Sequence, residues 1–231
     1  MYMIANNLNT IKGKIAVSAL KSGRKPEDIT LVAVTKTRSV EEILSAISYG
    51  VTDIGENYVQ ECLDKYPVIG KQAVWHFIGH LQSNKVKQVI DFADLIHSVD
   101  SFKLAKEISR RADQAGKVVN ILVEANLAEE ESKFGSSLEN LRNLVESISE
   151  LPFIKVSGLM GMAPVVEDAN QAREYFAKLK GIWDELPKEQ RVYLSMGMTQ
   201  DFEVAIEEGS NMVRIGTAIF GARQYAQSSV K

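Results

Sequence analysis

The chain of 231 residues is 45% hydrophobic and 25% charged, which is the balance of an ordinary soluble globular protein. Its formal net charge of −3 gives no basic field of the kind with which nucleic-acid-binding proteins gather phosphates. The only cysteine, Cys62, excludes a disulfide framework and a cysteine-based metal site, and no apolar stretch approaches the roughly 20 residues of a membrane span.

The N-terminus does not resemble a signal peptide, because Lys12 and Lys14 interrupt its apolar content before a hydrophobic region can form. Together with the single cysteine, this predicts a cytoplasmic protein. We expect neither nucleic acid nor a membrane among its partners.

The first predicted element is an N-terminal helix within residues 1–22, packed on the rest of the fold. Its apolar residues Ile4, Leu8, Ile11 and Ile15 recur at helical spacing, and Gly23 and Pro26 follow as stop signals.

After this helix, strand-like runs alternate with helical patterns. Eight strands are predicted, at 29–36, 52–55, 75–79, 95–98, 118–125, 154–159, 192–195 and 212–215. Seven helices are predicted to begin near Ser39, Glu56, Ser83, Ser101, Ser136, Glu167 and Thr199. The alternation predicts an α/β fold, a (β/α)8 TIM-type barrel with an additional N-terminal helix. A doubly wound open sheet is the alternative, but its glycine-rich phosphate turn is missing. We expect one domain over residues 1–231.

Lys36 ends the first predicted strand, where alternation places it on the same face as Val32 and Val34. If that face is buried, desolvation lowers the pKa of the amine and frees it to condense with a carbonyl. The alternative is a solvated surface charge at the strand end.

Two turns near the end of the chain suit an anion. The seventh strand runs into residues 195–199, Ser-Met-Gly-Met-Thr, and the eighth into Arg214, Gly216 and Thr217. In TIM barrels a phosphate site commonly follows strands seven and eight, so these turns predict a phosphate at the mouth that Lys36 also faces.

Several ordered motifs carry a resemblance over nearly the whole chain: Ala33-Val34-Thr35-Lys36, Gly55-Glu56-Asn57-Tyr58-Val59-Gln60-Glu61, residues 76–85 (HFIGHLQSNK), Gly158-Leu159-Met160, Ser195-Met196-Gly197-Met198 and Arg214-Ile215-Gly216-Thr217. The chain resembles the YggS/PROSC family of pyridoxal 5′-phosphate (PLP) homeostasis proteins, which are similar to the barrel domain of alanine racemase.

The resemblance implies PLP as the cofactor, held as a Schiff base on Lys36. It places Ser195, Gly197, Gly216 and Thr217 around the phosphate, Arg214 opposite the pyridine nitrogen, and Asn57 on a loop beside the cofactor.

Arg214 has a chemical consequence. A guanidinium only donates hydrogen bonds, so a pyridine nitrogen that faces it stays unprotonated and PLP is a weak electron sink. This argues against transaminase chemistry and leaves racemisation or cofactor holding open. Two-sided proton transfer needs a second acid/base group, which the racemases take from a C-terminal domain, and only residues 221–231 follow the last predicted turn here.

The favoured function is therefore PLP binding for intracellular PLP homeostasis, by buffering or delivery, without substantial turnover. The implied partners are PLP and PLP-requiring apo-enzymes, and we expect a monomer. One alternative is a PLP-dependent amino-acid racemase. Another is a phosphate-sugar barrel enzyme that uses Lys36 for a substrate Schiff base.

Other motifs favour structural interpretations. His76 and His80 are spaced i, i+4, but a metal site needs at least three protein ligands, so polar contacts at the barrel mouth are preferred and no metal is predicted. His97 is expected to be structural, Cys62 unreactive, and Met160, Met162, Met196 and Met198 core residues. Residues 129–131, Glu-Glu-Glu, are either a solvated turn or part of a lid over the cofactor.

Overall fold

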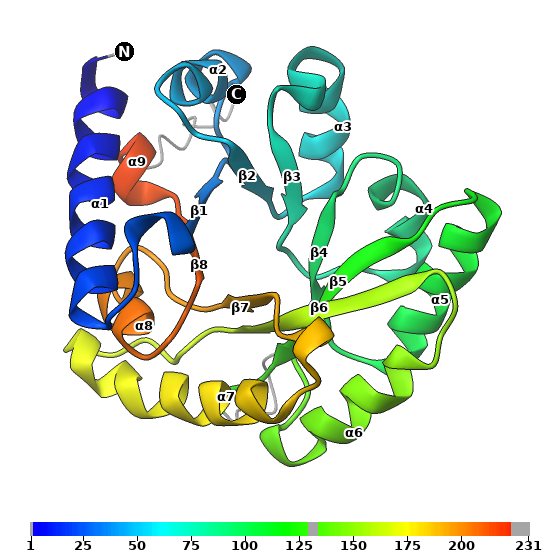
Figure 1. Ribbon diagram of the computed structural model, residues 1–231. Helices are drawn as coiled ribbons and strands as arrows, with labels where there is room; N and C mark the ends of the chain where they lie inside the picture. Colours follow the sequence, from blue (N-terminus) through cyan, green and yellow to red (C-terminus); the bar gives the residue numbers. More distant parts are fainter. Residues whose placement is uncertain (1, 129–133, 223–231) are drawn as a thin grey trace, which may run out of the picture.

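The computed structural model describes residues 2–128 and 134–222. Eight parallel strands form a closed barrel in sequential order, with helices on its outside (Figure 1). The strands are β1 Thr30–Val34, β2 Asp53–Glu56, β3 Val74–Phe77, β4 Leu95–Val99, β5 Val119–Ala125, β6 Ile154–Gly161, β7 Tyr193–Ser195 and β8 Met212–Ile215. The predicted TIM-type barrel is confirmed.

The described helices are α1 Tyr2–Lys21, α2 Val40–Ser48, α3 Val59–Ile69, α4 Val86–Val89, α5 Phe102–Gln114, α6 Leu138–Ser149, α7 Arg173–Glu185, α8 Phe202–Glu207 and α9 Thr217–Phe220. Short 3-10 helices cover Pro26–Asp28, Gly70–Gln72, Ser83–Lys85, Ala169–Ala172 and Lys188–Gln190. None of the described helices is both long and apolar enough to cross a membrane.

The N-terminal helix α1 lies alongside α8 and α9 on the outside of the barrel (Figure 1). Its buried residues include Ile4, Leu8, Ile11 and Ile15, the four that the helical spacing predicts. Burying this apolar stripe is what attaches the helix to the barrel. The additional N-terminal helix is therefore confirmed.

Serine caps explain where two helices begin. The Ser39 hydroxyl accepts a hydrogen bond from the N–H of Glu42, whose side chain accepts one from the Ser39 N–H. The Ser101 hydroxyl accepts one from Leu104 N–H at the start of α5. Such caps satisfy N–H groups that a helix leaves unpaired at its first turn.

Side chains from the strands form two layers because successive residues point to opposite faces. A small cluster fills the inside of the barrel, and a much larger one lies between the strands and the helices. We call the former the inner cluster; its members are Val32, Leu95, Leu122, Met160 and Met212, with Tyr193 packed against them.

The first strand is shorter than predicted. It ends at Val34, and Lys36 lies in the turn that follows, next to Thr37 with a positive φ of 63°. The core prediction is also wrong for Met162 and Met198, which are exposed.

Candidate functional site

A pocket of about 790 Å³ opens at the carboxyl ends of β1, β6, β7 and β8, and we call it the mouth pocket. Its lining includes Lys36 and Arg214 together with Gly216 and Thr217 of the turn after β8. These four residues, which come from opposite ends of the chain, are four of the seven that the sequence nominates. The parallel barrel brings them together because strands β1 and β8 are neighbours.

A cluster of charged side chains forms hydrogen bonds with the turn that carries Lys36. Lys65 of α3, with a side chain only 8% exposed, donates to the carbonyl oxygen of Thr35 at 2.9 Å. Its ammonium group also lies 2.6 Å from carboxylate oxygens of both Glu56 and Glu61. We call Lys65, Glu56 and Glu61 the buried ion cluster.

The same cluster holds the residues on both sides of Lys36. The Thr35 hydroxyl donates to Glu56 at 2.7 Å, and the Thr37 N–H donates to Glu61 at 2.7 Å. Burial raises the pKa of Glu56, and the nearby Lys65 opposes this rise. The cluster therefore restrains the backbone that carries Lys36, and the sequence interpretation did not include Lys65.

Arg214 lies in the barrel wall with only 4% of its surface exposed. Its Nη1 donates to the carbonyl oxygen of Ser195 at 2.8 Å and to the Ser195 hydroxyl, and its Nη2 donates to the carbonyl oxygen of Gly161 at 3.1 Å. These bonds use three of the five N–H groups of a guanidinium. Burial lowers the pKa of Arg214 to about 10, against the attraction of Glu124 and Asp201, so it remains a cation at neutral pH.

Three nominated residues do not line the mouth pocket, and their roles toward a cofactor stay predictions. Ser195 is fully buried, with its hydroxyl bonded to Arg214 and His97. Gly197 has a φ of +91°, and a Cβ there would come within 2.6 Å of the Ala205 Cβ, so the turn requires glycine. The Asn57 Oδ1 is buried and has no hydrogen-bond partner among the described residues.

Two carboxylates near Arg214 were not nominated from the sequence. Burial, with a contribution from Asp100, raises the pKa of Glu124 to about 7, while Arg214 acts in the opposite direction. Burial also raises the pKa of Asp201, whose carboxylate accepts the N–H of Met198 at 2.6 Å. Neither had a signal beyond being an acidic residue in or just after a predicted strand.

Of the histidines, His76 differs from expectation. It does not lie at the mouth: its ring is buried inside the barrel between Asp53 and His97, each at 2.9 Å. His80 makes a polar contact, with its Nδ1 3.7 Å from Asp100 Oδ2, and its ring stacks on Phe134 with centroids 3.8 Å apart. In the described part of the chain no three histidine, cysteine or acidic side chains are placed to hold a metal ion.

Two other predictions concern Cys62 and the acidic loop. Cys62 is buried, and burial raises the pKa of its thiol, which keeps it in the unreactive protonated form. The proposed lid residues 129–131 lie outside the described residues.

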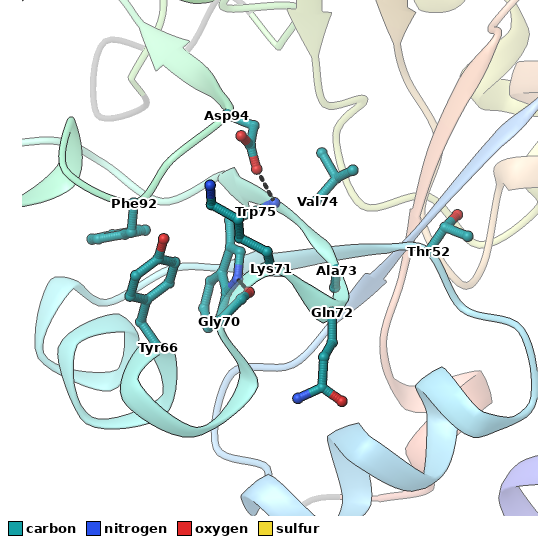
Figure 2. A pocket seen from close by; sticks show the side chains of 10 residues that line it. All are labelled: Thr52, Tyr66, Gly70, Lys71, Gln72, Ala73, Val74, Trp75, Phe92 and Asp94. Carbon is teal, nitrogen blue, oxygen red and sulfur yellow. Dashed lines mark hydrogen bonds between the residues drawn. The ribbon is translucent and has the colours of Figure 1, made fainter.

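A second pocket, of about 510 Å³, lies at the amino ends of the strands (Figure 2). Aromatic residues Tyr66, Trp75 and Phe92 form one side of it, and Thr52 lies on the other. Lys36 does not line it and lies beyond the opposite, carboxyl end of β1, so we do not place the Lys36 chemistry there.

Comparison with known proteins agrees with this geometry. The family model for the alanine racemase N-terminal domain matches residues 7–224. A pyridoxal phosphate homeostasis protein of Aquifex aeolicus is 44% identical over 222 residues, which cover 94% of this chain and 97% of that protein. The chain belongs to the pyridoxal phosphate homeostasis protein family. The resemblance inferred from the motifs is thereby confirmed.

Two further similar proteins extend the comparison. The pyridoxal phosphate homeostasis protein of Escherichia coli strain K12 is 40% identical over 232 residues, covering 97% of this chain and 98% of that protein. The structure of PipY from Synechococcus elongatus with PLP bound is 29% identical, with a TM-score of 0.80 over 94% of this chain and all of that one.

Proposed function

We propose that the mouth pocket binds PLP as a Schiff base on Lys36, and that the protein serves intracellular PLP homeostasis by buffering or delivering the cofactor without substantial turnover. The observation that carries this proposal is the meeting of Lys36, Arg214 and the Gly216–Thr217 turn in one pocket. Membership of a family whose named relatives are PLP homeostasis proteins supports it, as does the similarity to PipY, whose structure was solved with PLP bound.

Each part of the pocket suits one part of PLP. Lys36 would hold the aldehyde end of PLP through an imine, whose formation releases water and whose hydrolysis would release the cofactor. The hydroxyl of Thr217 and the close backbone approach at Gly216, where a Cβ would lie 3.2 Å from Val34, suit the phosphate. Met198 and Thr199, which follow Ser195 and Gly197 in the turn after β7, line the same pocket and would supply the other side of the phosphate site.

The charged and polar groups in and near the pocket suit those of PLP. Lys36 and Arg214 place two basic side chains in a lining that also includes Glu167, Asp168 and Asp201, and about 790 Å³ falls within the range of small-molecule sites. Asn57 does not line the pocket, but its buried Oδ1 has no partner among the described residues, and such an atom is costly unless a ligand or water satisfies it. These residues fit PLP.

Arg214 argues against transaminase chemistry. Bound PLP supplies an electron sink, and the sink is strongest when a carboxylate keeps its ring nitrogen protonated. Arg214 can only donate a hydrogen bond, so a nitrogen that faces it would stay unprotonated and the sink would be weak. Racemisation and cofactor holding both remain compatible with Arg214. Between them we propose holding, by a cytoplasmic monomer, with PLP-requiring apo-enzymes as the recipients.

The test is the absorption spectrum of the purified protein, followed by borohydride reduction and mass spectrometry. We expect a visible band and a reduced pyridoxyl group on Lys36. Lys36→Ala should lose both, whereas Lys106→Ala, at an exposed position of α5, should keep both. A wild-type protein that is colourless and takes up no added PLP would refute the proposal.

A second assay addresses the alternative. The PLP-loaded protein is incubated with L-alanine and other amino acids, and formation of the opposite enantiomer is followed. We expect no racemisation above a heat-inactivated sample. Turnover at ordinary enzymatic rates, about 1 per second or faster, would replace the holding function with a racemase.

A further inference from the structure

A continuous chain of hydrogen bonds crosses the interior of the barrel, and we call it the interior relay. Arg214 Nη1 donates to the Ser195 hydroxyl, which lies 3.2 Å from His97 Nδ1. His97 Nε2 lies 2.9 Å from His76 Nδ1, and His76 Nε2 lies 2.9 Å from Asp53 Oδ1. The relay thus joins β8, β7, β4, β3 and β2.

Like the inner cluster, the residues of the relay point into the barrel, and on β4 and β8 each lies two residues after a member of that cluster. His97 follows Leu95 by two residues on β4, and Arg214 follows Met212 by two on β8. Apart from Asp53, its members are at most 4% exposed. Buried polar groups of this kind are costly unless each has a partner, and here the ring nitrogens and the hydroxyl are all paired.

When both histidine rings are neutral, the two ends of the relay determine the direction of every bond. At one end Arg214 can only donate, and at the other an ionised Asp53 can only accept. Burial raises the pKa of Asp53, but hydrogen bonds from His76 and Thr52 outweigh this, so the pKa lies below its ordinary value and the carboxylate is ionised.

From Asp53 the protons follow in order. His76 donates through Nε2, so in its neutral form its Nδ1 accepts from Nε2 of His97. Burial lowers the pKa of His97 well below its usual value, with His76 and Arg214 adding to the effect, so this ring is neutral and its Nδ1 accepts the hydroxyl proton of Ser195. All donors therefore point toward Asp53.

The far end of the relay reaches the second pocket. The Thr52 hydroxyl donates to the other oxygen of Asp53 at 2.6 Å, and Thr52 is an exposed residue of the pocket in Figure 2. The opposite end, Arg214, lines the mouth pocket. The interior relay is thus a hydrogen-bonded connection between the two ends of the barrel.

We propose that Asp53, His76 and His97 are positioning residues of the mouth pocket, which act on Arg214 through Ser195. By fixing both histidine tautomers they direct the Ser195 proton to His97 and a Ser195 lone pair to Arg214. The guanidinium is then held with its two remaining N–H groups available to a ligand. The Ser195 hydroxyl proton is not available to a phosphate, so Ser195 contributes to cofactor binding through Arg214 and the backbone.

The first test needs no cofactor and is therefore independent of the proposed function. Nitrogen-15 NMR of the PLP-free protein resolves its three histidines, which are assigned from His76→Gln, His97→Gln and His80→Gln. In the stated direction of the relay, we expect the proton of His97, and of His76 in its neutral form, to lie on Nε2. A proton on Nδ1 of either neutral ring, or a charged His97, would overturn the relay direction.

The second test rests on PLP binding. His76→Gln interrupts the relay without touching the mouth pocket, and His80→Gln is the matched control outside it. Loss of one well-placed hydrogen bond corresponds to about threefold to tenfold weaker PLP binding in His76→Gln. We also expect a shift of its bound-PLP absorption band, which a purely structural role would not produce.

The outcomes of the two tests are distinguishable. If folded His76→Gln binds PLP with the affinity and band of His80→Gln, the positioning role is wrong. If wild-type protein binds no PLP, the proposed function is wrong, and the proposed positioning of a cofactor pocket is lost with it, while the NMR tautomers still decide whether the relay has the stated direction.

Discussion

The buried ion cluster beneath Lys36 offers a sharp test of what restrains that residue. Lys65→Met removes the ammonium group and its hydrogen bonds to Thr35, Glu56 and Glu61, while preserving much of the side-chain volume. The variant leaves Glu56, whose side chain has no exposed surface, as a buried carboxylate without its cation.

The size of the expected destabilisation depends on how deeply the Lys65 and Glu56 side chains are buried. An exposed ion pair contributes about 0–1 kcal/mol, but breaking a buried pair by removing one partner costs about 3–5 kcal/mol because the other charge stays desolvated. The Lys65 and Glu56 side chains are 8% and 0% exposed, so the buried case applies. We expect Lys65→Met to lower the free energy of unfolding by about 3–5 kcal/mol, a large part of the about 5–15 kcal/mol of a typical domain.

The assay is urea denaturation followed by circular dichroism. With a slope of about 3 kcal/mol per molar urea, the midpoint should fall by about 1–2 M. Lys106→Met, the same change at an exposed position of α5, is the control and should stay within about 0.5 kcal/mol of wild type. Adding Glu56→Gln to Lys65→Met should recover part of the loss, because no buried charge is then left unpaired.

The loss should also depend on pH. A carboxyl group whose pKa is raised on folding stabilises the protein only while it is protonated, so its contribution is lost as pH rises above the ordinary glutamate range. Lys65 lowers the pKa of Glu56, and its removal raises that pKa further. Lys65→Met should therefore be less destabilised near pH 5 than near pH 8. A loss below about 1 kcal/mol that is the same at both pH values would refute this reasoning.

Two further changes test the site. Gly197→Ala should destabilise the protein by about 1–3 kcal/mol in thermal denaturation and weaken PLP binding, because φ is +91° and the new Cβ meets Ala205. The control Gly13→Ala, which has open space around it within α1, should be neutral or stabilising. Equal effects of the two substitutions would contradict the argument. Glu124, with a pKa raised to about 7 from 4.5, should cost wild type about 3 kcal/mol of stability as pH rises through this range, and Glu124→Gln should lose that dependence in urea denaturation at several pH values. Parallel pH profiles of wild type and Glu124→Gln would show that this carboxyl does not titrate as stated.

Much of the fold was predictable because local signals and global structure agree. Apolar runs of strand length, helical spacing in α1, and Ser39 and Ser101 as caps each act through residues close in sequence. The errors occur at element ends. The first strand ends at Val34, although the Thr35 N–H still donates to the carbonyl oxygen of Gly55 on β2. The chain then turns at Thr37, whose φ is 63° and whose N–H donates to Glu61 of α3, a contact that no local pattern reveals.

The candidate site was predictable in part for a similar reason. Lys36, Arg214, Gly216 and Thr217 could be nominated because ends of parallel strands must meet at one end of a barrel, and the structure does bring them into one pocket. Which way the Ser195 hydroxyl faces could not be derived. It depends on His97, almost a hundred residues away, across the barrel interior.

The sequence by itself thus determined the class of fold, the family and the lysine on which the proposed chemistry depends, since these rest on periodicity and on ordered motifs along the chain. Only the tertiary structure decided what surrounds that lysine. Lys65 and His76 look like ordinary polar residues until the barrel closes, when burial removes water from them and makes each depend on a partner from another strand or helix.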